Sequence, residues 1–330
     1  MNVFGNLLRV SIFGESHGSL VGITLDGCPA GIKINMEEFN TDLARRKSGK
    51  IGTTPRKELD HPEFVSGIYQ ERTTGAPITI LFRNQNTQSK DYNDFLQKPR
   101  PGHADFTAHK KFGGFNDHRG SGHFSGRVTL GLVAAGVIAK KIIFPVFVNA
   151  ELIEAGGMKD IEQAVQYALR KNDTIGGLIQ CKAENVPVGL GEPFFDSVES
   201  LISHIIFSIP AIKGIEFGTG FQAAKMLGSE HNDPIINSEG KTETNHAGGI
   251  NGGITNGNDI IFRTAVKPPS STPKKQKTLN IETDEMEELE VKGRHDACIA
   301  LRMPVIVEAV TAFVLADFML QEQKTPRVFE

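Results

Sequence analysis

The stretch Pro304–Gln321 limits most strongly how this chain can fold. Its residues are apolar on nearly every side of a helix, and only Glu308 and Asp317 interrupt the run. A helix that is apolar all round is stable in water only when other parts of the protein cover it. A membrane span would need about 20 mostly apolar residues. We therefore expect no membrane span here, but a helix buried in a large core.

Four further stretches carry helix signals. Residues 125–141 are rich in alanine, valine and leucine and end on Lys140 and Lys141, where the helix dipole favours positive charge. Residues 36–46 have acidic residues early and arginines late, which is also the order that the helix dipole favours. Residues 160–170 and 197–208 each place apolar side chains on one face. These patterns predict four more helices.

Short β-prone segments lie between the expected helices. Residues 7–25 alternate as strand, loop and strand would, and further short segments are 78–82, 177–182, 259–266 and 289–291. Helices and strands do not follow a regular βαβ order, and no dinucleotide-binding glycine fingerprint follows a strand. We predict an α+β fold with antiparallel sheets. Because no long linker interrupts the chain, we expect residues 1–330 to form a single domain.

Charge and cysteine content limit the class of protein. A net charge of −3 argues against nucleic-acid binding, which needs a basic face, so any anion site must be local. Cys28, Cys181 and Cys298 are too few and scattered for a disulfide framework or a thiolate zinc site. The first ten residues lack the apolar core of a secretory signal. We expect a cytoplasmic protein whose thiols are buried.

Three short motifs combine a histidine with glycine far apart in the chain: residues 14–18 (GESHG), 100–105 (RPGHAD) and 293–296 (GRHD). Glycine allows tight backbone turns, and histidine titrates close to neutral pH. The repetition predicts an active site assembled from distant segments. His17 and His103 are candidate proton donors to a departing phosphate oxygen, although either alone would also fit a structural role. Asp296 is a candidate buried base, or equally a cap or the partner of an arginine.

Cationic residues gather in three groups, and several arginines converging on one pocket would hold a small polyanion. One such group alone would favour a solvated face, but Gly49, Gly52, Thr53 and Thr54 indicate an ordered loop beside the first group. Residues 245–253 and 267–271 would suit a flat or phosphorylated ligand, or ordinary turns. The three groups are Arg45, Arg46, Lys47, Lys50 and Arg56; Arg119 and Arg127; and Lys267 and Arg294.

Taken together and in this order, the motifs closely resemble those of the chorismate synthase family. A single short motif would be weak, but these matches run nearly from end to end. They are residues 13–18 (FGESHG), 42–46 (DLARR), 53–56 (TTPR), 89–92 (SKDY), 100–107 (RPGHADFT), 208–211 (SIPA), 228–233 (GSEHND), 245–253 (NHAGGINGG), 267–271 (KPPSS) and 293–296 (GRHD).

The resemblance implies a lyase of the shikimate pathway that converts 5-enolpyruvylshikimate 3-phosphate to chorismate and phosphate by an anti-1,4-elimination. The family needs reduced FMN, which lends electron density although the reaction has no net redox change. Some members reduce the flavin with NADPH, which would then contact Arg46, and others depend on an external flavin reductase. The family fold places long central helices between antiparallel sheets in a β-α-β sandwich, and its members are usually homotetramers.

Individual roles also follow from the resemblance. His17 matches the histidine that protonates the leaving phosphate, and His103 the one that protonates or hydrogen-bonds the reduced flavin. Asp296 matches an aspartate that assists proton removal at flavin N5, with Ser16 and Ser125 as relay hydroxyls. Substrate-binding positions are Arg46, Arg127, Arg294, Lys50 and Arg56. FMN-binding positions are His123, Phe124, Ser125, Pro210, Ala211, Gly252, Lys267, Pro268, Pro269, Ser270, Ser271 and Arg294.

Before the first long helix the chain departs from the family pattern. The family usually reads GRSSAR there, whereas residues 122–127 read GHFSGR, which removes a fixed charge beside the flavin. Two other classes of protein stay open. A metal-dependent phosphohydrolase would use His17, His103, His295 and Asp296 as ligands, although no tight ligand spacing supports this. A non-catalytic flavin- or phosphate-binding protein would use the same loops but would not need both histidines.

Overall fold

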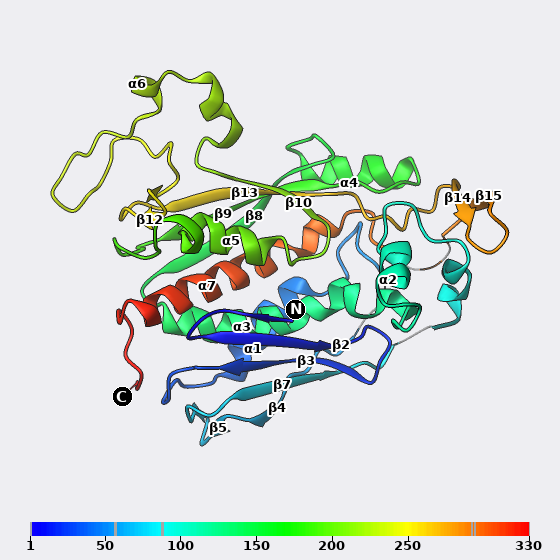
Figure 1. Ribbon diagram of the computed structural model, residues 1–330, viewed down its shortest axis with the longest axis horizontal. Coiled ribbons are helices and arrows are strands. Elements are labelled where there is room, and N and C mark those ends of the chain that lie inside the picture. The colour runs from blue at the N-terminus through cyan, green and yellow to red at the C-terminus, as the bar shows by residue number, and fades with distance from the viewer. Residues whose placement is uncertain (1, 56–57, 87–88, 292, 294, 330) are drawn as a thin grey trace.

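Two antiparallel sheets enclose a layer of helices in the computed structural model, which describes residues 2–329 except 56–57, 87–88, 292 and 294 (Figure 1). The first sheet contains, in spatial order, β1 (Val3–Phe4), β2 (Arg9–Gly14), β3 (Leu20–Asp26), β7 (Ile78–Arg83) and β4 (Glu63–Ser66). The second contains β10 (Ile212–Phe217), β13 (Ile260–Val266), β9 (Gly177–Glu184) and β8 (Phe147–Ala155). All neighbouring strands in both sheets are antiparallel.

The helix layer contains α1 (Met36–Arg46), α3 (Thr129–Ile142), α5 (Val198–Ile206) and α7 (Pro304–Gln321), while α4 (Ile161–Arg170) covers the outer face of the second sheet (Figure 1). Smaller elements lie at the ends of the sandwich. They are α2 (Asp105–Lys111), α6 (Gly228–His231), the strand pairs β5–β6 (Ile68–Tyr69, Arg72–Thr73), β11–β12 (Ile250–Asn251, Ile254–Thr255) and β14–β15 (Gln276–Asn280, Glu285–Leu289), and the 3-10 turns η1 (Ser89–Leu96), η2 (Arg119–Phe124), η3 (Gly126–Val128), η4 (Phe194–Asp196), η5 (Gly220–Lys225) and η6 (Ile299–Arg302).

Helix α7 forms the centre of the core. It packs on α3 and on strands β8 and β9, and a Cβ atom at Gly136 of α3 would lie only 2.3 Å from Ala309 of α7. In length and composition α7 would pass for a membrane span, yet 89% of it is buried inside the protein, as in a core helix. The two acidic residues that interrupt it, Glu308 and Asp317, are 2% exposed and hydrogen-bonded.

The sequence-based predictions of fold class and of the main helices are confirmed. The chain is α+β, the central helices lie between antiparallel sheets, and α1 and α7 have the expected bounds. Helix α3 begins at Thr129 instead of residue 125, because Ser125 caps a 3-10 turn that precedes the helix. The prediction of a strand at 289–291 is wrong by several residues, since strand β15 ends at Leu289. Cys28, Cys181 and Cys298 are buried free thiols, as expected.

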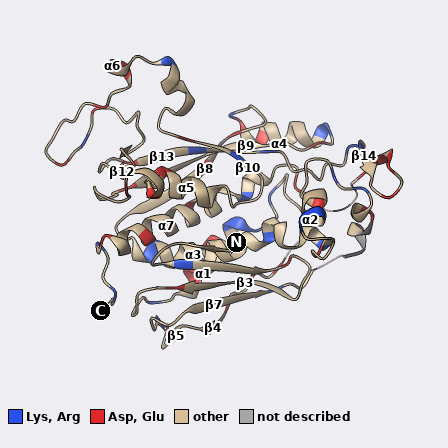
Figure 2. Ribbon diagram, viewed as in Figure 1, with Lys and Arg blue, Asp and Glu red and all other residues tan. Residues whose placement is uncertain are grey.

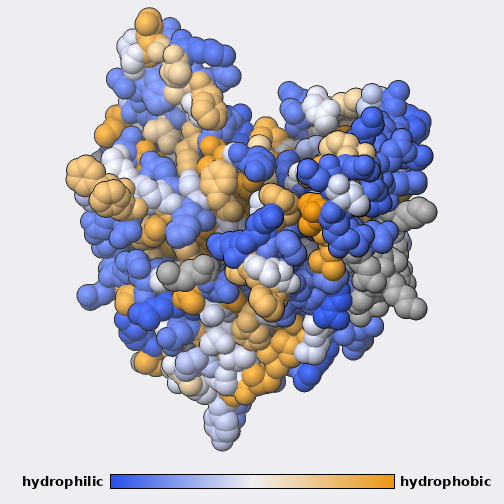
Figure 3. Space-filling model, turned by 45° about the vertical axis from the view of Figure 1, so that its right-hand side comes forward, coloured by the Kyte–Doolittle hydropathy of each residue, from blue (hydrophilic) through white to orange (hydrophobic). Residues whose placement is uncertain are grey.

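Basic and acidic residues are interspersed along the ribbon, which agrees with the small net charge (Figure 2). A segment that carries η5 and α6 projects from the sandwich (Figure 1). In the space-filling view it bears apolar residues among hydrophilic ones (Figure 3). Its exposed apolar side chains are Phe221, Leu227, Ile235 and Ile236.

Candidate active site

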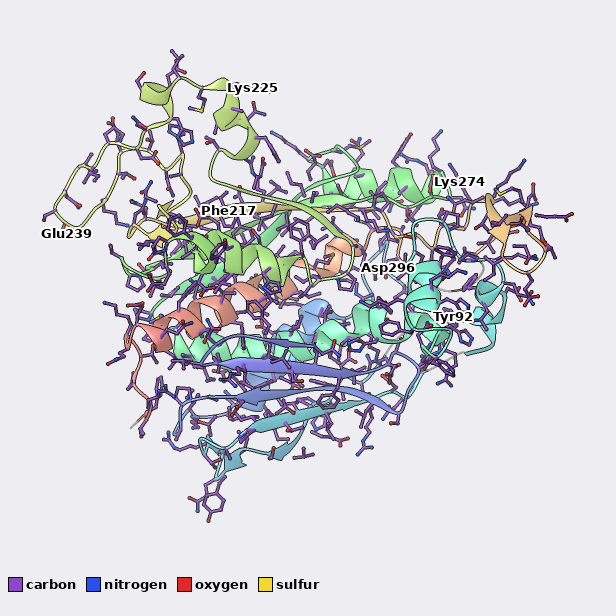
Figure 4. The ribbon with its side chains drawn as sticks, viewed as in Figure 1. Tyr92, Phe217, Lys225, Glu239, Lys274 and Asp296 are labelled. Atoms are coloured by element: carbon purple, nitrogen blue, oxygen red, sulfur yellow. The ribbon has the colours of Figure 1, made fainter. Side chains whose placement is uncertain are left out.

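Two adjoining cavities lie at the end of the helix layer near α2, where Asp296 and Tyr92 are found (Figure 4). The smaller has a volume of about 330 Å³ and the larger about 710 Å³. Both values fall within the range of small-molecule sites. The cavities share several lining residues, among them Tyr92, Ser125, Pro210 and Asp296, so that ligands in the two would lie side by side.

Arginines from three separate elements line the smaller cavity. Arg46 lies at the end of α1, Arg127 in η3 and Arg302 in η6. Arg46 is only 3% exposed, and its guanidinium donates to the Gly126 carbonyl at 2.7 Å and to Thr129 Oγ1 at 3.2 Å. Arg127 donates to Asp60 at 2.7 Å. These contacts fix two guanidinium groups against the cavity before any ligand arrives.

Charge in the smaller cavity favours an anion. Burial lowers the pKa of Arg46, the positive charges of Arg302 and Arg127 lower it further, and the negative charges of Asp60 and Asp296 raise it. An arginine in such surroundings stays protonated at neutral pH, so its unbalanced charge is costly. A bound phosphate or carboxylate would offset that cost and accept hydrogen bonds from the guanidinium groups.

Asp296 lines both cavities and is held from two sides. The Thr54 amide donates to its Oδ1 at 2.9 Å, and Arg302 Nη1 donates to Oδ1 and Oδ2 at 3.1 and 3.3 Å. The next two amides, of Ala297 and Cys298, both donate to the Gly52 carbonyl and fix the loop that carries Asp296. The carboxylate therefore holds an arginine, one of the roles expected from sequence, and is also placed between the two cavities.

Ser16 and His17 follow strand β2 and are 1% and 7% exposed. Ser16 lines the smaller cavity, whereas His17 lies behind the lining and meets the Tyr92 ring edge-on at 5.0 Å. Gly120, which has a φ of 57°, lines the cavity in front of them. A Cβ atom at Gly120 would lie 2.7 Å from His17 Nε2 and 3.0 Å from Ser16 Oγ. The missing side chain of Gly120 therefore leaves the His17 imidazole close to the cavity.

His103 lines the larger cavity and belongs to a hydrogen-bonded cluster ahead of α2. Its Nδ1 lies 2.7 Å from Asp105, which also accepts from Arg100 Nε at 2.7 Å. Burial lowers the pKa of His103. The hydrogen bond to Asp105 raises this pKa, and the charge of Arg100 lowers it further. Burial raises the pKa of Asp105, but hydrogen bonds from Arg100 and His103 outweigh it and leave that pKa well below its usual value. The cluster thus contains a neutral imidazole between an ionised carboxylate and the cavity.

Most positions expected to bind FMN line the larger cavity. Lys267 Nζ donates to Ser270 Oγ at 2.7 Å, and burial, followed by the charge of Lys213, lowers the pKa of Lys267. His123 Nδ1 lies 2.8 Å from the Gly14 carbonyl, so this histidine bonds to the backbone. The expected residues found in the lining are His123, Phe124, Ser125, Pro210, Ala211, Lys267, Pro269, Ser270 and Ser271.

Some expected residues do not come together there. Lys50 is exposed and lines neither cavity, and Pro268 is absent from both linings although its neighbours are present. Gly252 lies in the turn between β11 and β12, at the opposite end of the molecule from α2 (Figure 1). Arg56 and Arg294 lie outside the described residues.

Other cavity residues were not predicted as site residues. Asp60 lines the smaller cavity, Arg100 the larger one, and Tyr92 both. Lys47, which belongs to the first cationic group, also lines the smaller cavity. Tyr92 and Arg100 do fall within motifs that the chain shares with the family, which was an available signal. Arg302 falls in no such motif. Among the described residues, no three His, Cys, Asp or Glu side chains group as a metal site would require.

Comparison with known proteins shows the family to which the chain belongs. The family model described as chorismate synthase matches residues 8–320. The chain is 62% identical to chorismate synthase of Chitinophaga pinensis over 100% of both chains, and 44% identical to that of Dehalococcoides mccartyi over 100% of this chain and 99% of the other. It also resembles a crystal structure of chorismate synthase, with a TM-score of 0.73 and 26% identity over 97% of this chain and 93% of the other. The chain therefore belongs to the chorismate synthase family and is an enzyme of that type, a carbon–oxygen lyase of the shikimate pathway.

Proposed function

We propose that the enzyme catalyses the anti-1,4-elimination of the 3-phosphate and the C6 hydrogen from 5-enolpyruvylshikimate 3-phosphate, and that it needs reduced FMN to do so. The observation that carries the proposal is the cavity lined by the buried arginines Arg46 and Arg127, which shares Asp296 and Ser125 with a larger cavity. The smaller cavity suits a compact polyanion, and the larger one leaves room for a flavin beside it.

In the smaller cavity, Arg46 and Arg127 bind the phosphate and carboxylates of the substrate. Both are held in place by their own hydrogen bonds, so that little side-chain entropy is lost when the substrate binds. The family resemblance adds Arg294 and Arg56 to this set. Lys47 lines the cavity and is a better candidate for the lysine contact than Lys50, which is exposed.

The residues of the larger cavity fit a phosphorylated flavin. Lys267 and Lys213 both line it, and a phosphate would offset the burial and the repulsion by Lys213 that lower the pKa of Lys267. Pro210, Ala211 and Phe124 offer apolar surface to a flat ring. Reduced FMN, when bound, lends electron density as the allylic C3–O bond breaks and recovers it as the C6 hydrogen leaves.

Proton transfer and the hydrogen bond to the flavin are assigned to five side chains around the two cavities. His17 protonates the leaving phosphate, with the Ser16 hydroxyl between the imidazole and the cavity. Asp296 assists proton removal at flavin N5, together with the Ser125 hydroxyl. His103 hydrogen-bonds the flavin edge from the larger cavity. The burial of Ser16 and His17 keeps bulk water away from the departing oxygen.

Assembly and flavin reduction are proposed from the family resemblance. The enzyme forms a homotetramer in the cytoplasm, and the exposed apolar side chains of the projecting segment, such as Phe221 and Leu227, offer contact surface between subunits. Reduced FMN comes from NADPH, with Arg46 as a contact, or from an external flavin reductase. The single domain 1–330 is supported by one main hydrophobic core that joins both sheets.

An anaerobic assay tests the proposal. Purified protein is incubated with 5-enolpyruvylshikimate 3-phosphate and chemically reduced FMN, and chorismate and phosphate are both quantified. NADPH with oxidised FMN forms a parallel arm. We expect equal amounts of the two products, and turnover in the parallel arm would add flavin reduction by the enzyme itself. Absence of product despite confirmed FMN binding would leave a flavin-binding protein as the better account.

The variant His17→Ala separates an enzyme from a binding protein. Loss of the proton donor should lower kcat by about a hundredfold or more while FMN still binds. His204→Ala is the matched control, because His204 is exposed and lines neither cavity. A metal-dependent phosphohydrolase would instead release phosphate without chorismate and would lose activity in a chelator.

A further inference from the structure

Ser121 occupies a backbone conformation that disfavours residues with a side chain. It lies in η2 with φ and ψ of 70° and 8°, between Gly120 and Gly122, which also have positive φ. Glycine adopts this left-handed region freely, and serine does not. A strained residue of this kind persists when its side chain is needed, most often at a functional site. We therefore expect the side chain of Ser121 to have a function.

The Ser121 hydroxyl contacts His103. Its Oγ lies 3.0 Å from His103 Nε2, and Arg100 Nη2 donates to the same Oγ at 3.4 Å. Both Ser121 and His103 line the larger cavity. Because Arg100 can only donate, the single hydroxyl hydrogen of Ser121 is available for His103 Nε2.

The other ring nitrogen of His103 fixes the direction of this bond. Nδ1 lies 2.7 Å from Asp105 Oδ1, an oxygen that also accepts from Arg100 Nη2 at 2.8 Å. Arg100 Nη2 also lies 3.1 Å from Nδ1, but the contact of Nδ1 with Asp105 is shorter. An ionised carboxylate only accepts hydrogen bonds, so Nδ1 carries the imidazole hydrogen and donates it to Asp105. In the neutral ring Nε2 is then an acceptor, and the Ser121 hydroxyl is its donor.

We propose that Ser121 is a positioning residue for His103. Its hydroxyl donates to His103 Nε2 at the wall of the larger cavity and thereby holds His103 as the Nδ1–H tautomer. A ligand group that reaches His103 either replaces the Ser121 hydroxyl or is contacted by that hydroxyl. The inference rests on the proposed function only for its effect on turnover. The tautomer of His103 is a property of the protein alone.

Two variants test the proposal on the full-length protein. Ser121→Ala removes the hydroxyl and keeps the backbone strain, and Ser121→Gly removes both. We expect each to lower kcat by about tenfold, the usual effect of one lost hydrogen bond, with KM for the substrate within about twofold. Ser121→Gly should melt at the same or a higher temperature than the wild type, because glycine relieves the strain. Lower activity without lower stability would not follow from a purely structural role.

Asn185→Gly is the matched control, since Asn185 also has a positive φ, 61°, and lines neither cavity. It should keep full kcat. Nitrogen NMR of 15N-histidine protein, with His103 assigned through His103→Gln, should show a neutral Nδ1–H ring in the wild type and a shifted Nε2 resonance in both Ser121 variants. Unchanged kcat and an unchanged His103 spectrum in Ser121→Gly would overturn the proposal. If the wild type formed no chorismate, only the proposed function would fail, and the NMR result would still decide the role of Ser121.

Discussion

Arg302 joins Asp296 to the backbone of Arg46. Its Nη1 donates to both carboxylate oxygens of Asp296, at 3.1 and 3.3 Å, and its Nε donates to the Arg46 carbonyl at 2.9 Å. One guanidinium group thereby sets the distance between the loop that carries Asp296 and the end of α1 that carries a buried arginine. The relative placement of the proposed base and the proposed anion site depends on this link.

Changes at Arg302 should therefore impair catalysis more than folding. We expect Arg302→Met to lower kcat by about a hundredfold, because a misplaced catalytic group costs about that much. Arg302→Lys should lower kcat less, since lysine keeps the positive charge but lacks the planar set of donors of a guanidinium group. Arg263→Met is the control, because Arg263 pairs with Glu216 at 2.9 Å and lines neither cavity. Steady-state kinetics and thermal melting measure both effects. Normal kcat in Arg302→Met would contradict the assigned role.

A methyl group at Gly120 should displace His17 and Ser16. The Cβ atom of Gly120→Ala would meet His17 Nε2 at 2.7 Å, and the φ of 57° also disfavours alanine. Gly189→Ala carries a comparable penalty from its φ of 96° but has no atom within 4 Å of the new Cβ. Both variants should lose about 1 kcal/mol of stability, and only Gly120→Ala should also lose about a hundredfold in kcat. Equal activities of the two variants would show that catalysis does not depend on the position of His17 behind Gly120.

The lowered pKa of His103 predicts how stability depends on pH. A histidine whose pKa in the folded protein lies below its ordinary value of 6.5 favours folding above pH 6.5, and this contribution is lost as the pH falls through the folded pKa. When the pH falls from about 7.5 to about 5.5, the wild type should therefore lose more free energy of unfolding than His103→Gln does. Urea titrations at both pH values measure it. A shift in the opposite direction would mean that folding favours the protonated imidazole.

Asp317 should be important for stability. Its carboxylate accepts backbone hydrogen bonds from Asn6, Leu7 and Leu8, each at 2.8 Å, and thereby fastens the start of the first sheet to α7. Asp317→Ala should cost about 3 kcal/mol or more, because it leaves buried donors without a partner. Asp26→Asn, at an exposed carboxylate, should change stability by less than about 0.5 kcal/mol. A small effect of Asp317→Ala in urea unfolding would contradict the structural reading.

Local patterns in the sequence predicted much of the fold. The all-round apolar character of 304–321 identified the buried helix, and the charge order of 36–46 identified α1 with its bounds. Strand β8 was missed because its outward side chains include charged residues and leave only a weak apolar pattern. Glu308 looked like an interruption of α7, but Arg45 and Lys140 neutralise it in the core. An ion pair between a buried carboxylate and partly exposed cations of distant segments leaves no local signal.

The candidate site was predictable to the extent that its residues lie in motifs. His103, Ser125 and Asp296 were singled out by motifs and line the larger cavity. Arg302 was missed because it is recruited only when η6 packs against the end of α1. His17 was expected to face the ligand, and the structure instead places Gly120 in the lining in front of it. Such relations depend on how distant segments pack.

A crystal structure with 5-enolpyruvylshikimate 3-phosphate and FMN bound together would test the central claim most directly. We predict that the substrate phosphate and carboxylates lie against Arg46 and Arg127 in the smaller cavity. The flavin should fill the larger cavity beside His103, with Asp296 between the two ligands. Binding of either ligand elsewhere, or a substrate that contacts neither arginine, would contradict the account.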